Sequence, residues 1–282
     1  MEYKSLAKLN LYLDILSRRE DGYHDLEMVM VPIALFDKVE ISLHSGPKDI
    51  IECDGFTADN IKTNSAYKAL QAMRKKFGFS ETFKVKIEKH IPSGAGLGGG
   101  SSNAASVINA INELLNLNAS DEALNEVAKL IGADVPFFLK SEPALVKGIG
   151  EHLSPITVKD NYDVLLIKPA VSLSTAHIYK LSDKLPMIHG NIDDVLDALA
   201  NGNLNLLAKS MFNSLEAPAF SEAPVIKEIK DKLYELGFKA LLMSGSGSTI
   251  YALTNDQELL NNGVEAFKDS NHWVYVTTFN EQ

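Results

Sequence analysis

The most informative segment of this 282-residue chain is Gly94-Ala95-Gly96-Leu97-Gly98-Gly99-Gly100-Ser101-Ser102-Asn103. Glycine occupies four of the five positions 96–100, although each glycine inside a helix costs about 1 kcal/mol relative to alanine. Glycine lets backbone N–H groups approach an anion closely, and the serines that follow begin a helix whose positive end also favours phosphate. A flexible loop is the alternative, but it would not need Ser-Ser-Asn to start a helix at once. The stretch therefore predicts a phosphate-binding loop.

Three common phosphate-binding motifs fit this stretch poorly. A Walker A motif needs lysine and then serine or threonine after its last glycine, and here Ser101 follows directly. Three of the glycines match the dinucleotide pattern G-x-G-x-x-G, but Pro92 separates them from a strand that alternates with charge. No acidic residue ends a second strand about twenty positions further on. Protein kinases carry His-Arg-Asp and Asp-Phe-Gly segments, which are absent from this sequence.

Composition excludes several classes of protein. With 45% apolar residues the chain can bury one large core or two linked cores. A net charge of −10 repels a nucleic-acid backbone, although the basic segment 84–90 could still hold a small anion. Cys53 is the one cysteine, so an intrachain disulfide and a Cys-based zinc site within one chain are excluded. We expect a cytoplasmic protein with no membrane partner, because residues 1–10 lack an apolar signal core and no apolar run approaches ~20 residues. Its oligomeric state, monomer or homodimer, stays open.

Periodicity predicts a mixture of strands and helices. Apolar residues alternate with polar ones over residues 9–15, which favours a strand with Lys8 and Asn10 on its other face. Alternating or short apolar runs predict strands over residues 28–35, 38–43, 83–87, 164–167, 240–243, 250–253 and 273–278. Helical patterns predict helices over 64–77, 104–115, 122–131, 192–200, 204–215, 225–236 and 257–267. Because these elements do not alternate strictly, the predicted class is α+β.

Four segments together resemble a known kinase family. The stretch Pro92–Ser102 resembles the ATP-binding motif of the galactokinase, homoserine, mevalonate and phosphomevalonate (GHMP) kinase superfamily. Ala7–Leu11 with Asp21–His24, then Gly132–Phe137, then Met243–Thr249 follow the order of that family. The Asp-Gly-Tyr-His segment resembles the branch whose substrate joins a cytidine diphosphate group to methylerythritol.

The resemblance implies a fold and a reaction. The fold would be a two-domain α+β kinase, with a nucleotide-binding domain over residues 1–157, a C-terminal domain over 158–282, and the active site in the cleft between them. ATP would phosphorylate the 2-hydroxyl of the cytidylyl-methylerythritol substrate in the non-mevalonate isoprenoid pathway, with Mg²⁺ as the second cofactor. Leu6, Asn103 and Ser248 stand where the family commonly has proline, aspartate and proline, which leaves the role of Asn103 open.

Two residues are the catalytic candidates that the resemblance implies. Asp134 would accept the proton of the substrate hydroxyl, or orient that hydroxyl; the alternative is an aspartate that caps the turn before Pro136. Lys8 would stabilise charge on the transferring phosphoryl group, and the alternative is a solvated strand lysine. Its shared strand face with Asn10 favours a site over that alternative.

The remaining candidates bind the two substrates. The implied ATP-binding residues are Pro92, Ser93, Gly94, Ala95, Gly96, Leu97, Gly98, Gly99, Gly100, Ser101, Ser102, Asn103, Lys89 and Asn64. Ser101 or Ser102 would help to place Mg²⁺, which would rest mainly on phosphate oxygens because no carboxylate ligand is evident. The implied residues for the cytidylyl substrate are Asn10, Tyr23, His24, Thr175, Tyr179, Gly245 and Ser246.

Aromatic stacking would hold the cytosine. Tyr23 and Tyr179 would stack on the base and His24 would bond its edge, although either tyrosine could instead be an ordinary half-buried residue. The second glycine-rich turn, Ser244–Thr249, would close over substrate or phosphates, or could simply be a turn that needs positive φ. A sister GHMP kinase, a non-catalytic nucleotide-binding protein and, more distantly, a Rossmann oxidoreductase remain rival interpretations.

Overall fold

The computed structural model describes residues 1–57 and 60–279, which form two compact units. The first unit comprises Met1–Ala7, Leu35–Ser93 and Gly98–Glu142, and the second comprises Lys8–Ala34, Gly94–Leu97 and Pro143–Gln282. The units are discontinuous in sequence, so the division at residues 157 and 158 stays a prediction. Each unit contains helices and strands, which confirms the α+β class.

Two long strands run through both units. They are β1 (Glu2–Arg18) and β2 (His24–His44). The sequence predicted two separate strands where β2 is continuous. Asp37 lies in the middle of β2 without ending it, because its carboxylate is buried and fully hydrogen-bonded.

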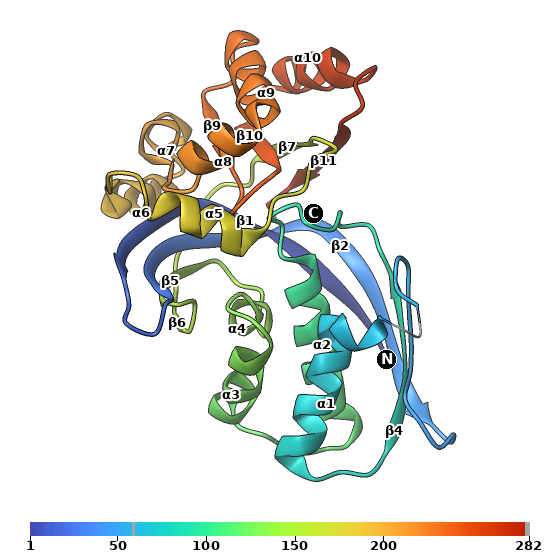
Figure 1. Ribbon diagram of the computed structural model, residues 1–282. Coiled ribbons are helices and arrows are strands. Elements are labelled where there is room, and N and C mark those ends of the chain that lie inside the picture. The colour runs from blue at the N-terminus through green and yellow to red at the C-terminus, as the bar shows by residue number, and fades with distance from the viewer. Residues whose placement is uncertain (58–59, 280–282) are drawn as a thin grey trace. The chain divides into compact units, whose positions relative to one another are not determined.

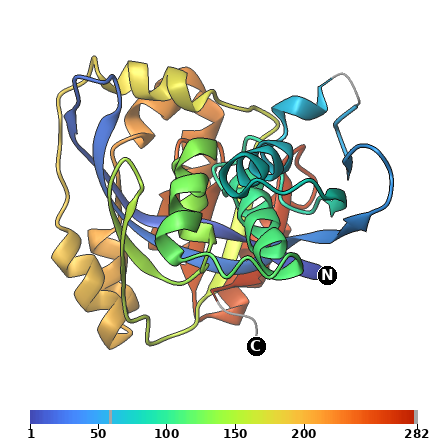
Figure 2. The same cartoon turned by 90° about the horizontal axis from the view of Figure 1, so that it is seen from below.

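In the first unit, four helices cover one face of a sheet with strand order β3-β4-β2-β1 (Figures 1 and 2). The added strands are β3 (Ile50–Cys53) and β4 (Thr82–Glu88). The four helices are α1 (Ser65–Phe77), α2 (Gly99–Leu114), α3 (Asp121–Ile131) and α4 (Val135–Phe138), and a short 3-10 helix, η1 (Ile61–Thr63), precedes α1. β4 pairs antiparallel with β2, from Lys38 opposite Glu88 to His44 opposite Thr82. Alternation along these strands buries apolar residues under the helices and leaves charged ones on the open face.

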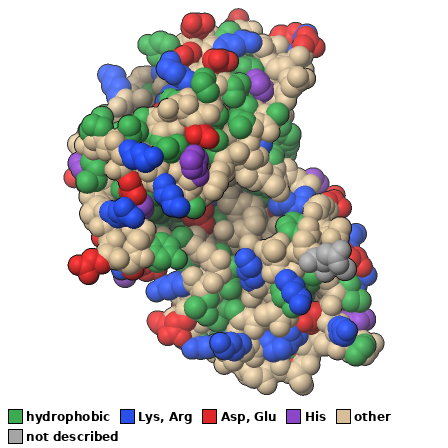
Figure 3. All heavy atoms as spheres, viewed as in Figure 1, with side chains coloured by type: hydrophobic (Ala, Val, Ile, Leu, Met, Phe, Trp, Pro, Cys, Tyr) green, Lys and Arg blue, Asp and Glu red, His purple; other side chains and the backbone are tan. Residues whose placement is uncertain are grey.

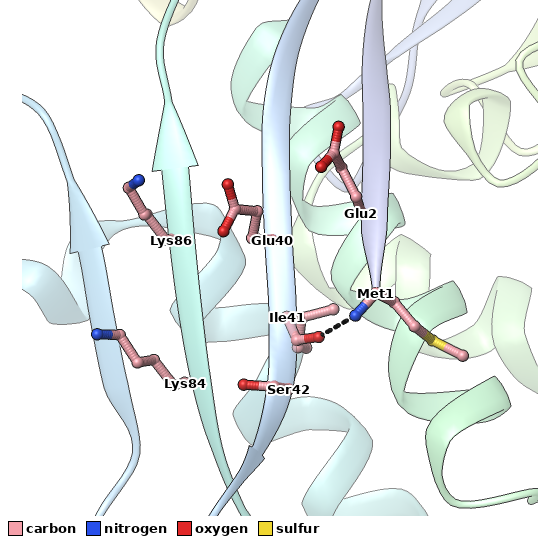
Figure 4. A pocket seen from close by; sticks show the side chains of 7 residues that line it. All are labelled: Met1, Glu2, Glu40, Ile41, Ser42, Lys84 and Lys86. Carbon is pink, nitrogen blue, oxygen red and sulfur yellow. Dashed lines mark hydrogen bonds between the residues drawn. The ribbon is translucent and has the colours of Figure 1, made fainter.

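The open face of this sheet holds surface ion pairs. Figure 4 shows Lys84 and Lys86 of β4 beside Glu40 of β2, with Glu2 of β1 on the far side of Glu40, where they line a shallow pocket. Lys84 pairs with Glu52 at 2.9 Å. The basic segment 84–90 is therefore not one anion site, because its first two lysines project from this open face.

The second unit contains an antiparallel sheet with strand order β11-β7-β10-β9, and helices α9 and α10 pack on it (Figure 1). Its elements are β5 (Ala144–Gly148), β6 (His152–Pro155), β7 (Asp163–Lys168), α5 (Thr175–Ser182), α6 (Ile192–Asn201), α7 (Leu204–Ser210), β8 (Phe212–Asn213), α8 (Glu216–Glu222), α9 (Pro224–Glu235), β9 (Ala240–Met243), β10 (Ile250–Thr254), α10 (Gln257–Phe267) and β11 (Trp273–Thr278). In the same unit β5 pairs with the first half of β2, β6 pairs with β5, and β8 pairs with β1.

The helix predicted over residues 204–215 is shorter than expected. It ends at Ser210, and Phe212 and Asn213 pair with β1 instead. The Asn213 side chain donates to the carbonyl oxygens of Met243 and Gly245, both at 2.8 Å. Tertiary hydrogen bonds thus override the helical pattern here, which sequence periodicity could not reveal.

The molecular surface carries both signs of charge. Figure 3 shows Lys and Arg side chains over the helices of the first unit, although the net charge of the chain is −10. Local basic groups therefore coexist with an acidic composition. Within the described ranges, none of the helices combines the length and the apolar composition needed to cross a membrane.

Candidate active site

The second half of the glycine-rich stretch forms the first turn of α2. Gly98 adopts φ 76°, a left-handed conformation that favours glycine, and its carbonyl accepts from Ser102 N at 2.9 Å. A Cβ on Gly99 would lie 2.9 Å from Ile91 Cγ2 and 3.2 Å from Lys89 Nζ. In the described part of the chain, no side chain caps this helix end. Its N–H groups are thus suited to an anion such as a phosphate.

The first half of the stretch packs against the second glycine-rich turn inside the second unit. Gly96 has φ +74°, and a Cβ built there would lie 2.0 Å from the Ser244 carbonyl oxygen. Ser244 Oγ donates to the Gly96 carbonyl at 2.9 Å, and Thr249 N donates to the Ala95 carbonyl at 3.3 Å. This close backbone approach by itself requires glycine at position 96.

Lys8 and Asn10 lie beside that turn. Lys8 is 3% exposed, so it is not a solvated strand lysine, and its Nζ donates to Asn10 Oδ1. A Cβ on Gly245 would lie 3.2 Å from Lys8 Nζ and 3.6 Å from Asn10 Oδ1. Burial raises the pKa of Tyr251, whose phenol therefore stays protonated and donates to the Asn10 carbonyl at 2.7 Å. The structure thus gathers three predicted residues, Lys8, Asn10 and Gly245.

Asp134 follows α3 and stands at the N-cap position of α4 in the first unit. Within the described residues its side chain makes no capping hydrogen bond, which argues against a purely structural aspartate. The neighbouring Gly132 lies beside the start of α2, since a Cβ built on it would be 4.0 Å from Ser101 Oγ. The segment that carries Asp134 therefore adjoins the loop expected to hold the phosphates.

Asp37 is a site residue that sequence reasoning missed. It is 0% exposed and accepts from His90 N and Ile91 N, both at 2.8 Å, from Asn103 Nδ2 at 3.0 Å, and from Lys89 Nζ. One carboxylate thereby joins the segment before the glycine-rich stretch to the first turn of α2. Asn103 Oδ1 is buried with no hydrogen-bond partner within residues 1–57 and 60–279.

A signal for Asp37 was present in the sequence. Leu35, Val39 and Ile41 alternate on the buried face of β2, and the same period of two places position 37 on that face. A buried aspartate requires hydrogen-bonding partners, so the pattern indicated a polar network.

Two candidate ATP-binding residues have structural partners. Lys89 is paired with Asp37, and Asn64 Oδ1 accepts from Ala66 N at 2.8 Å as the N-cap of α1. These contacts position the segments around the loop, and the ATP-binding roles of Lys89 and Asn64 stay predictions.

The candidates for the cytidylyl substrate lie together in the second unit. The rings of His24 and Tyr179 stack with their centroids 5.0 Å apart, while Tyr23 is 60% exposed. Thr175 Oγ1 and Ser246 Oγ are 2.8 Å apart. The structure therefore joins helix α5 to His24 and to the second glycine-rich turn, and it leaves the Tyr23 ring open to solvent.

Comparisons with known proteins agree with this fold. Residues 64–142 match the model of the GHMP kinases N terminal domain, and residues 195–272 match that of the GHMP kinases C terminal. The first match includes the glycine-rich stretch, Asp134 and helices α1 to α4. The chain therefore belongs to the GHMP kinases.

Its similarity to one branch extends over nearly the whole chain. A 4-diphosphocytidyl-2-C-methyl-D-erythritol kinase of Acetivibrio thermocellus is 38% identical over 277 residues, which is 97% of each chain. One of Clostridium perfringens is 35% identical over 280 residues, 98% of this chain and 97% of its own. A crystal structure of 4-(cytidine 5'-diphospho)-2C-methyl-D-erythritol kinase is similar with a TM-score of 0.81 and 32% identity, and the match covers 98% of this chain and 99% of that one. Within the superfamily the chain belongs to the 4-diphosphocytidyl-2-C-methyl-D-erythritol kinases.

Proposed function

We propose that this chain transfers the γ-phosphate of ATP to the 2-hydroxyl of 4-diphosphocytidyl-2-C-methyl-D-erythritol, as a cytoplasmic step of the non-mevalonate isoprenoid pathway. The observation that carries the proposal is the glycine-rich start of α2. In the described residues, no side chain caps this helix end. Buried Lys8 beside the second glycine-rich turn supports it. So does the family relationship over nearly the full length.

Asp134 and Lys8 carry the chemistry in this proposal. Asp134 accepts the proton of the 2-hydroxyl, or orients it, while the oxygen forms a bond to the γ-phosphorus and the bond to the β-phosphate oxygen breaks. ADP leaves with the bridging oxygen. Lys8 offsets the negative charge on the transferring phosphoryl group, since such transfers depend mostly on positioning and charge stabilisation. Asn10, which accepts from Lys8 Nζ, holds the ammonium in place.

Mg²⁺ is the second cofactor in the proposal. Residues 1–57 and 60–279 contain no group of three or more His, Cys, Asp or Glu side chains that could hold a metal ion. Mg²⁺ often keeps several waters and binds substrate phosphates with only one or two protein ligands. The hydroxyl oxygens of Ser101 and Ser102 at the start of α2 suit that role. Mg²⁺ would neutralise phosphate charge there.

The cytidine group is held by the second unit in this proposal. Tyr23 and Tyr179 provide aromatic faces, and His24 offers a ring nitrogen to the base edge. Thr175, Gly245 and Ser246 complete the site beside Lys8 and Asn10. This arrangement is supported by the contacts within the second unit, and its exposed Tyr23 ring is free to cover a base.

Release of ADP tests the proposal directly. The chain would be incubated with Mg-ATP and, separately, with 4-diphosphocytidyl-2-C-methyl-D-erythritol, mevalonate, homoserine or galactose. Turnover with only the first substrate is expected. Turnover with another acceptor would support kinase activity but refute the proposed substrate. ATP binding without any turnover would favour a non-catalytic nucleotide-binding protein.

Replacing Tyr23 with alanine is expected to raise the KM for the cytidylyl substrate by about 5- to 150-fold, because stacking on a base is worth ~1–3 kcal/mol. Steady-state kinetics with each substrate varied in turn would measure the change. Tyr234→Ala is the matched control, since Tyr234 on α9 is 59% exposed and has no role in the site. A rise confined to the KM for ATP would place Tyr23 at the nucleotide instead.

A further inference from the structure

One face of α5 is built from residues four positions apart. Thr175, Tyr179 and Asp183, the last at the C-cap, lie on the same side of a helix with 3.6 residues per turn. Each makes a contact expected to bear on the substrate: Thr175 with Ser246, and Tyr179 and Asp183 with His24. Thr175 and Tyr179 were candidates from the sequence, whereas Asp183 was not, because no helix was predicted over residues 175–182.

Two contacts hold the His24 imidazole. Tyr179 stacks against its face at a centroid distance of 5.0 Å, and Asp183 Oδ1 lies 2.7 Å from its Nε2. Arg18 NH1 pairs with the other carboxylate oxygen, Asp183 Oδ2, at 3.4 Å. The His24 side chain is 10% exposed. The stacking contact therefore restricts the plane of the His24 ring, and the contact with Asp183 restricts rotation of the ring within that plane.

The carboxylate also decides which ring nitrogen carries hydrogen. A carboxylate only accepts hydrogen bonds, so His24 Nε2 must carry the hydrogen that it donates to Asp183. In the neutral ring, Nδ1 is then an acceptor. Within the described ranges the hydrogen bond of the His24 ring is made by Nε2, which leaves Nδ1 as the ring nitrogen that can accept from a ligand.

An acceptor at this position distinguishes pyrimidine bases. Cytosine presents a 4-amino donor, whereas a uracil-type base presents a 4-oxo acceptor at the same place. We propose that Asp183 is a positioning residue, which holds the His24 ring in the orientation and tautomer that make Nδ1 a hydrogen-bond acceptor. The site would then bind a cytosine nucleotide more tightly than a uracil nucleotide. The inference rests on the proposed function, because it takes the base at His24 to be that of the substrate. A site built to accept one hydrogen bond rejects an analogue that cannot donate it.

Binding of CDP and UDP tests this selection without relying on turnover. Calorimetry would be carried out with saturating ADP present to occupy the ATP site. The unchanged chain is expected to bind CDP at least about tenfold more tightly than UDP. Asp183→Ala and the isosteric Asp183→Asn are both expected to lower that ratio about tenfold, since an alanine frees the ring and an asparagine can donate to Nε2 and so permit the opposite tautomer.

Glu222→Ala is the matched control. Glu222 of α8 pairs with His177 of α5, with Oε2 3.2 Å from the ring Nε2. Its loss is expected to leave the CDP/UDP ratio unchanged. Equal loss of affinity for both nucleotides in the Asp183 variants would show a merely structural role and overturn the proposal. So would an unchanged ratio in these variants, or the absence of a CDP preference in the unchanged chain.

Nitrogen-15 NMR of labelled histidine provides a readout of the tautomer itself. The unchanged chain is expected to show His24 protonated at Nε2, with the signal assigned by its absence in His24→Gln. A hydrogen on Nδ1 instead would refute the proposal that Asp183 holds His24 in the Nε2-protonated tautomer. An intact CDP preference together with no turnover of the cytidylyl substrate would refute the proposed reaction while retaining the role of Asp183.

Discussion

Replacing Asp134 with asparagine is expected to lower kcat by about 10²–10⁴-fold, the usual contribution of a positioned general base. Asparagine keeps the size and most of the polarity of aspartate but cannot accept the hydroxyl proton. The carboxylate makes no capping hydrogen bond to α4 within the described residues, so folding is expected to be nearly unaffected. Rapid-quench measurement of ADP and phosphorylated product at saturating substrates would give the rate.

The matching control is Asp121→Asn. Asp121 lies in the same unit, at the start of α3, and forms an exposed ion pair with Lys140, which contributes at most about 1 kcal/mol. Full activity is expected in this control, and calorimetry should show near-normal ATP affinity in both variants. If Asp134→Asn turned over at the unchanged rate, Asp134 could be neither base nor orienting group.

Replacing Asp37 with alanine is expected to reduce the free energy of unfolding by about 3–5 kcal/mol, because removing one partner of a buried ion pair leaves the other charge uncompensated. Lys89 loses its carboxylate, and the backbone amides of His90 and Ile91 and the side-chain amide of Asn103 lose their acceptor. The KM for ATP should rise as well, since this network joins the segment before the glycine-rich stretch to α2. Urea denaturation would measure the stability change.

Glu40→Ala is the control on the same strand. Glu40 pairs with Lys38 on the open face of the sheet at 3.3 Å, and an exposed pair contributes about 1 kcal/mol or less. The free energy of unfolding of Asp37→Asn should lie between those of Asp37→Ala and Glu40→Ala, because an amide oxygen preserves one acceptor but not the charge. A urea midpoint in Asp37→Ala equal to that of Glu40→Ala would contradict the proposed importance of the network.

Local sequence patterns predicted much of the architecture. The helix expected over residues 257–267 is α10, and those expected over 122–131 and 225–236 differ from α3 and α9 by one residue at their ends. Period-two alternation likewise located β4, and the strand expected over residues 273–278 is β11. These agreements arise because helix and strand periods are properties of neighbouring residues, which the sequence displays directly.

Features that depend on distant partners were not predicted. Asp37 has its partners about fifty to sixty-six positions away along the chain, and Asp183 bonds a histidine 159 positions earlier. The short helix α5, which positions Tyr179 and Asp183, was not expected at all. The sequence also did not predict that the glycine-rich stretch is divided between the two units. The boundary between Leu97, in the second unit, and Gly98, in the first, follows from the packing of the chain.

Residue types at short and fixed spacing were enough to predict the α+β class and the kinase family, and they also predict the phosphate-binding loop. The side chains that hold that loop and that orient the candidate base-binding histidine became evident only from the folded structure. The physical reason is that a buried carboxylate is stable only where donors from other segments converge on it. That convergence depends on strand register and helix packing, which no local pattern records.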